Sequence, residues 1–209
     1  MSGTAARKDL IVLVADQDMK ATLEGLLVRT ESLGIRPITF EVLPHPRHDA
    51  GCRTQSAEFL RPFTNRFIQC LVLFDHEGCG EEQSAATELE DSVNERLAKS
   101  GWGARSNVIV LEPELEVWIW SDSSAVDQCC GWTGQSLPLR EWIAEQFPFQ
   151  DNGKPIRPKE AFRAILRQTG KIPSSSLFRE LATKVGLKRC QDRAFLRLKA
   201  TLADWFPTK

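Results

Sequence analysis

The stretch Phe67–Gly80, FIQCLVLFDHEGCG, decides the fold of this chain of 209 residues. Its first part, which ends at Phe74, is an almost continuous apolar run, typical of a strand that is buried on both faces of a sheet. Asp75 then opens a polar turn that contains Gly78 and Gly80, and such a turn ends a strand. We therefore predict a central strand of a parallel sheet that ends in acidic residues.

Three more strands are predicted from apolar runs on either side of this stretch, at Leu10–Val14, Ile38–Leu43 and Val108–Leu111. Helical spacing of apolar residues predicts three connecting helices, Met19–Leu33, Thr54–Phe63 and Glu81–Lys99. A loop is predicted before the second of them, at His45–Arg53. Strands that alternate with helices predict an α/β fold, a mostly parallel sheet with helices on both faces.

The pattern changes near residue 122, so we predict an α/β domain over 1–122 and a helical extension over 123–209 that packs on it. A polar, turn-rich segment, Ser121–Gln135, spans this boundary. The predicted helices of the extension are Leu139–Phe147, Lys159–Gln168, a helix capped by Ser174 that runs through Leu181, and Arg193–Phe206.

Bulk composition excludes several classes of protein. The chain has 27 Lys and Arg against 28 Asp and Glu, so no overall positive field would collect nucleic acid. Its six cysteines form no CxxC pair, which gives a structural zinc site little support. With no apolar run suited to a signal peptide or a membrane span, we expect a cytoplasmic protein with reduced thiols. The sequence leaves the oligomeric state open.

Acidic residues follow three of the four predicted strands. They are Asp16 and Asp18 after the first strand, Asp75 and Glu77 after the third, and Glu112, Glu114 and Glu116 after the fourth. The carboxyl ends of parallel strands meet at one edge of a sheet, where sites are built. Several carboxylates in one crevice repel each other without a cation, and Mg²⁺ prefers oxygen ligands. We therefore predict Asp16, Asp75, Glu77 and Glu112 as Mg²⁺ ligands, with Asp16, Asp75, Glu77 and Glu116 as the catalytic set.

Each of these groups also has an ordinary structural interpretation. Asp75 or Asp18 can cap the helix that follows it, and Glu77 can favour a helix N-terminus. A helix starting near Pro113 would place Glu112 and Glu116 on one face and turn Leu115 and Trp118 inward, over a buried core. Three residues of the second loop, His45, His48 and Asp49, are further candidates for the same edge.

Two basic stretches mark the C-terminal part. They are Lys154, Arg157, Lys159, Arg163, Arg167 and Lys171, and then Arg179, Lys184, Lys188, Arg189, Arg193, Arg197 and Lys199. Such residues either contact phosphates or form a solvated helix face, and the sequence leaves both interpretations open.

Three features together resemble TOPRIM-like proteins, especially the DUF4276-type families. They are Asp75-His76-Glu77, the acidic turn after the first strand, and the segment Glu112–Trp118 (EPELEVW). Within that group, the chain is most similar to proteins of bacterial methylation-associated defence systems. The resemblance implies a Mg²⁺-binding acidic pair, here Asp75 and Glu77. It also implies a Glu after the first strand, where this chain has Asp16.

The resemblance implies a component of an anti-phage defence system. The first hypothesis is a Mg²⁺-dependent nuclease or phosphoryl-transfer domain that acts on nucleic acid. The alternative is a non-catalytic TOPRIM-like subunit that docks or senses within a complex of defence proteins, and the shorter Asp16 in place of Glu favours it. No membrane is expected in either case.

Overall fold

A computed structural model describes residues 6–120 and 123–208, and in them four strands form one parallel sheet. The strands are β1 (Lys8–Val14), β2 (Phe40–Pro44), β3 (Phe67–Asp75) and β4 (Ser106–Leu111), in the order β2-β1-β3-β4. Every neighbouring pair is parallel. The predicted α/β fold with a parallel sheet is therefore confirmed.

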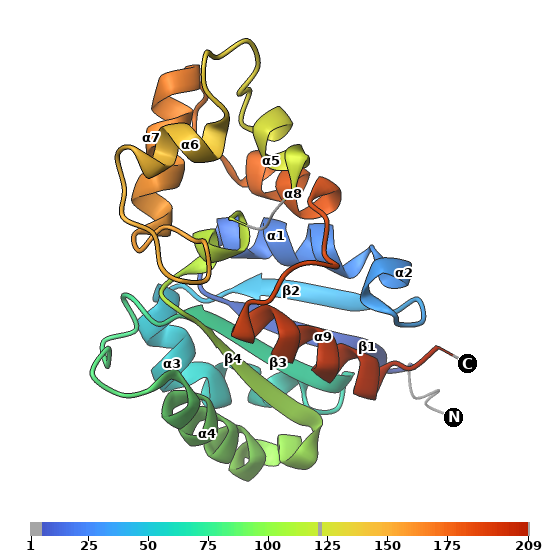
Figure 1. Cartoon of the computed structure of the whole chain (residues 1–209). Helices are drawn as coiled ribbons and strands as arrows, with labels where there is room; N and C mark the ends of the chain where they lie inside the picture. Colours follow the sequence, from blue (N-terminus) through green and yellow to red (C-terminus); the bar gives the residue numbers. More distant parts are fainter. Residues whose placement is uncertain (1–5, 121–122, 209) are drawn as a thin grey trace.

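Helices cover both faces of the sheet (Figure 1). One face carries α3 (His48–Leu60) and α4 (Ala86–Leu97), which contact each other as well as the strands. The other face carries α1 (Gln17–Leu27) and α9 (Arg193–Trp205), the last helix of the chain. Because both faces are covered, β1, β3 and β4 are almost entirely apolar and buried, as the sequence pattern predicted.

The strand order places β1 and β3 at the centre of the sheet. The chain leaves β1 for β2 on one side, and then crosses back to β3 on the other side of β1. Ligand sites in open parallel sheets lie at such a reversal, beside the carboxyl ends of the strands. In this chain that position is occupied by the residues that follow Val14 and by Asp75.

The C-terminal helices pack on the sheet domain through α1. They are α5 (Ser124–Cys129), α6 (Leu139–Ala144), α7 (Pro158–Thr169) and α8 (Ser175–Lys184). The Ser175 hydroxyl donates to Asp18 Oδ1 at 2.6 Å, and the guanidinium of Arg29 donates to the carbonyls of Ala182 and Val185. The predicted boundary between 122 and 123 falls beside residues 121–122, outside the described part of the chain, and stays a prediction.

Short helical elements complete the described structure. They are α2 (Thr30–Leu33), η1 (Arg61–Phe63), η2 (Ala98–Trp102), η3 (Gly103–Arg105) and η4 (Leu115–Trp118). Among the described residues, no helix combines the length and the apolar character that crossing a bilayer requires.

Some predicted element boundaries were wrong. The helix predicted over Glu81–Lys99 begins only at Ala86, because Glu82 Oε1 accepts the amides of Gly78 and Gly80 and holds the preceding turn. The helix predicted over Met19–Leu33 is interrupted after Leu27. The segment predicted as turn-rich, Ser121–Gln135, contains the helix α5, which Ser123 caps.

The loop predicted over His45–Arg53 is mostly helix, since α3 begins at His48. Gly51 misled the interpretation, because glycine weakens a helix. Its role here is close packing: a Cβ at Gly51 would lie 2.0 Å from Nδ1 of the His45 ring. The His45 side chain is buried, and its Nδ1 accepts the Arg47 amide, so the ring is held against the helix.

We predict that Gly51→Ala destabilises the protein by up to about 2 kcal/mol, measured by urea unfolding. Alanine improves helix propensity by about 1 kcal/mol, but overpacking against a buried ring costs about 1–3 kcal/mol. Gly186→Ala is the control, because the Ser123 hydroxyl, the atom nearest to the added Cβ, would be 3.9 Å away. It should shift stability by less than about 0.5 kcal/mol. A stabilised Gly51→Ala variant would show that the His45 ring moves freely.

Candidate metal centre

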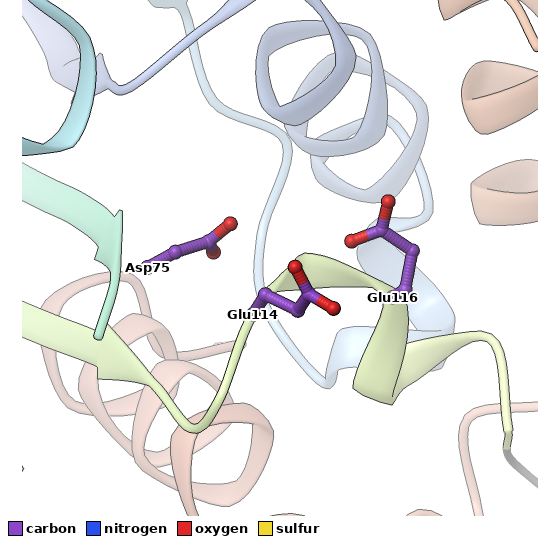
Figure 2. Close-up of side chains that lie close together, drawn as sticks. All are labelled: Asp75, Glu114 and Glu116. Carbon is purple, nitrogen blue, oxygen red and sulfur yellow. The ribbon is translucent and has the colours of Figure 1, made fainter. Parts of the chain in front are cut away.

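Three carboxylates converge at the carboxyl edge of the sheet: Asp75, Glu114 and Glu116 (Figure 2). One oxygen from each lies within 4.8 Å of the others. Two ligand oxygens on an octahedral Mg²⁺ are about 3 to 4 Å apart, so a small closure would suffice. The three side chains supply oxygen donors alone, which suits a hard divalent cation.

Asp75 is the last residue of β3, and the strand delivers its side chain toward the two glutamates. Its Oδ1 atom is buried and has no hydrogen-bond partner. Burial raises the pKa of Asp75 well above its usual range, and the charges of Asp49 and Glu116 raise it further. A buried carboxyl oxygen without a partner is costly, and this atom could be satisfied by a metal ion bound in the cluster.

Glu114 and Glu116 come from the segment that follows β4. The register pairs Asp75 with Leu111, so this segment starts beside the end of β3. Glu114 has an extended backbone, and η4 begins immediately after it and carries Glu116. Both glutamate residues are only 6% exposed. Burial raises the pKa of Glu116 to about 7; Lys159 opposes this rise, while Glu114 and Asp16 add to it.

One cation reaches the cluster from the C-terminal helices. Lys159 lies in the first turn of α7; its Nζ donates to Glu114 Oε2 at 3.0 Å, and its amide donates to Glu114 Oε1 at 3.1 Å. Burial alone would lower the pKa of Lys159, but Glu116 and Glu114 raise it overall. Glu114 therefore holds the start of α7 against the sheet, and Lys159 stays charged.

Two aspartates extend the negative field of the cluster. Asp49, in the first turn of α3, accepts the Asp75 amide through Oδ1 at 2.8 Å. Burial raises the pKa of Asp49, and Asp16 raises it too, against the effect of its hydrogen bonds. Asp16 follows β1 and caps α1, accepting the amides of Asp18 and Met19. Its charge thus acts on both Asp49 and Glu116.

The other predicted site residues lie apart from this group. Glu77 is exposed, and its backbone amide donates to Pro113 O. The helix predicted near Pro113 is the short η4, so Glu112 and Glu116 do not share a helix face. Leu115 and Trp118 are buried, as predicted. Asp16, Glu77 and Glu112 are not in the group of ligand-distance oxygens, and their assignment as Mg²⁺ ligands stays a prediction.

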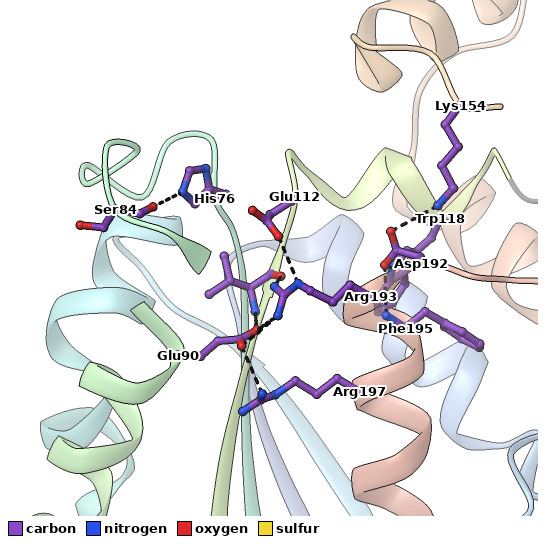
Figure 3. Close-up of polar contacts among 11 residues, drawn as sticks. His76, Ser84, Glu90, Glu112, Trp118, Lys154, Asp192, Arg193, Phe195 and Arg197 are labelled. Carbon is purple, nitrogen blue, oxygen red and sulfur yellow. Dashed lines mark hydrogen bonds and ion pairs between the residues drawn. The ribbon is translucent and has the colours of Figure 1, made fainter. Parts of the chain in front are cut away.

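Glu112 belongs to an ion-pair network beside β4 (Figure 3). Arg193 of α9 donates through Nε to Glu112 at 3.1 Å and through Nη1 to Glu90, which is fully buried. The same arginine donates to Val110 O, while Glu90 accepts the Val110 amide. The network satisfies the backbone of Val110 at the outer edge of the sheet and fixes α9 there.

Sequence reasoning missed Glu114 as a candidate ligand, and Lys159 as its partner. Glu112, Glu114 and Glu116 alternate in the sequence, so their types alone do not show which of them turn inward. The cis peptide between Glu112 and Pro113 was likewise not predicted. Lys159 was recognised only as part of a basic stretch, and no local signal links it to an acidic residue 45 positions earlier.

Fold and site together define an α/β protein with a buried carboxylate cluster, suited to a divalent cation, at the reversal point of a parallel sheet. Comparisons with protein-family models, with curated proteins and with solved structures give no match. The candidate metal centre therefore rests on the geometry of this chain.

We predict that stability falls as pH rises from about 5 to 7.5, and that Glu116→Gln reduces this fall. The folded chain keeps a proton on Glu116 up to about pH 7, whereas the ordinary glutamate value is 4.5. The stabilisation is complete below the unfolded value and is lost by about pH 7. It amounts to at most about 3 kcal/mol. Urea unfolding across this pH range, without metal, measures the slope.

The control is Glu58→Gln, which changes an exposed carboxylate of α3. Its free energy of unfolding should change with pH as steeply as that of the unaltered protein. Equal slopes for Glu116→Gln and the unaltered protein would mean that Glu116 is ionised throughout, and that the cluster is less buried than described.

Proposed function

We propose that the chain is a Mg²⁺-dependent phosphoryl-transfer enzyme, a nuclease, whose metal is held by Asp75, Glu114 and Glu116. The observation that carries this proposal is the buried Asp75 Oδ1, which has no partner and belongs to a side chain that faces two buried glutamates. Burial and mutual repulsion destabilise the ionised carboxylates in the folded protein, and a bound divalent cation offsets that destabilisation.

The residues around the cluster fit such chemistry. A bound Mg²⁺ would polarise a phosphoryl oxygen and favour ionisation of a bound water. Lys159 holds Glu114 in place and adds a positive charge at the edge where a phosphate would lie. Asp16 and Asp49 lie close enough for their charges to act on the cluster, and they are suited to hold water molecules of a hydrated Mg²⁺.

Nucleic acid as the substrate, and anti-phage defence as the setting, rest on the resemblance to TOPRIM-like proteins of the DUF4276 type. Two exposed arginines of α7, Arg163 and Arg167, lie one turn apart on the helix that carries Lys159 in its first turn. They form a basic face that continues from the cluster, suited to a phosphodiester backbone. Other proteins of the defence system are the proposed partners.

A second candidate is a non-catalytic subunit of the same kind of complex. Two observations favour it: Lys159 already neutralises Glu114, and Asp16 uses Oδ1 to cap α1. An internal ion pair of this kind can take the place of a metal in a domain that has kept the fold without turnover.

We expect purified protein to bind Mn²⁺ or Mg²⁺ by calorimetry and to cleave DNA or RNA with metal present. Asp75→Asn and Glu116→Gln should lower both metal affinity and cleavage at least about tenfold. Glu77→Gln should retain both, because Glu77 is exposed and outside the ligand-distance group.

The comparison of Glu116→Gln with Glu77→Gln decides which carboxylates bind the metal. Loss in Glu77→Gln alone would favour the ligand set predicted from sequence over the cluster. No metal binding at millimolar concentration in the unaltered protein would reject the enzyme and support the non-catalytic subunit.

A further inference from the structure

A cavity lies between the sheet edge and the C-terminal helices, with a volume of about 710 Å³. Cavities that bind small molecules are typically about 300–1,000 Å³. His76 and Pro113 line it on the sheet side, each next in sequence to a carboxylate of the metal centre. Lys154 and Arg140 line it from the extension. The cavity is thus built jointly by the two parts of the chain.

Part of its wall is fixed by ion pairs. Asp192 accepts from Lys154 Nζ at 3.2 Å, from Trp118 Nε1 at 2.9 Å and from the Phe195 amide at 3.1 Å (Figure 3). The Lys154 and Asp192 side chains are about nine-tenths buried. The ion pair fixes this part of the wall in position. Because the two charges neutralise each other, the pair does not attract an anion.

Arg140 is different: among the described residues, its guanidinium donates to two backbone carbonyls and to no side chain, and its charge acts on Asp127 without a hydrogen bond. The carbonyls are Trp120 O at 2.9 Å and Gly153 O at 3.2 Å. Within the described part of the chain, no carboxylate lies at ion-pair distance from it. The two carbonyls fix the guanidinium plane, and the remaining N–H donors are available in a cavity that Arg140 lines. Such a planar fork matches the oxygens of a phosphate.

The remaining surface of the cavity suits a heterocycle. Gln191 is exposed and makes no hydrogen bond with described residues, and Gln150 uses only its oxygen, toward Asn152. Both amides line the cavity and can pair with the edge of a base. Ile156, which is 48% exposed, provides an apolar surface for the face of a ring.

We propose that this cavity binds a nucleoside phosphate, either free or as one unit of a strand, with Arg140 on the phosphate and the Gln150 and Gln191 amides on the base. The inference goes beyond the proposed function, because none of these residues belongs to the metal centre. The cavity can hold its ligand whether or not the cluster binds metal.

Binding is measured in the presence of EDTA, so that no divalent cation is bound at the metal centre. Fluorescence anisotropy of a short fluorescein-labelled oligothymidylate reports the strand, and calorimetry with AMP reports the free nucleotide. Arg140→Gln should weaken binding about tenfold, the value of a charged hydrogen bond. Its control is Arg61→Gln, which removes the same charge from an exposed position of η1 outside the cavity.

Arg140 also holds two backbone carbonyls, so its loss can disturb folding. Gln191→Glu removes no described contact and places a negative charge in the cavity; it should weaken binding roughly threefold or more. Gln168→Glu makes the same change on the exposed face of α7 and should leave binding unchanged. Thermal melting of each variant confirms the fold.

Binding of both ligands supports a site for free nucleotides, and binding of the oligonucleotide alone supports a strand-binding site. The inference is overturned if neither binds at millimolar concentration, or if Arg140→Gln and Gln191→Glu bind as tightly as their controls. Failure of the metal centre is detected separately, as absence of metal binding by the unaltered protein in calorimetry, because the cavity measurements in EDTA do not depend on the metal.

Discussion

The parallel pairing of β3 with β1 on one side and β4 on the other is the constraint on which the site depends. Parallel strands end at the same edge, so the register that pairs Asp75 with Leu111 brings the segment after β4 beside the end of β3. This register brings Glu114 and Glu116 within reach of Asp75. The return of the chain between β1 and β3 adds Asp16 and Asp49 to the same edge.

Such an edge concentrates negative charge in a buried place, and the protein offsets only part of it. Lys159 neutralises Glu114, while burial raises the pKa of Glu116 to about 7 and leaves Asp75 Oδ1 without a partner. The C-terminal helices are consequently part of the site, because they supply that lysine. They also supply Arg140 and the wall of the neighbouring cavity.

Predictions from the sequence were good where the signal was local and failed where it was not. The apolar run through Phe74 predicted the central strand, which the structure confirms. Asp75 and Glu116, two of the site residues predicted from the acidic strand ends, lie in the carboxylate cluster, and their roles stay predictions. The loop predicted at His45–Arg53 was wrong, because most of this segment belongs to α3. Gly51 is needed there to leave room for the His45 ring, which packs against the helix. Likewise, the inward turn of Glu114 depends on a lysine in α7.

The sequence by itself determined the α/β fold, the parallel sheet and the acidic strand ends, because apolar periodicity and strand-end chemistry are encoded within a few neighbouring residues. Only the tertiary structure decided which carboxylates converge, which one Lys159 neutralises, and that Glu112 pairs with Arg193 instead. The reason is physical: a charge is stabilised by whatever lies within a few ångströms in space, and these partners are 45 and 81 residues apart along the chain.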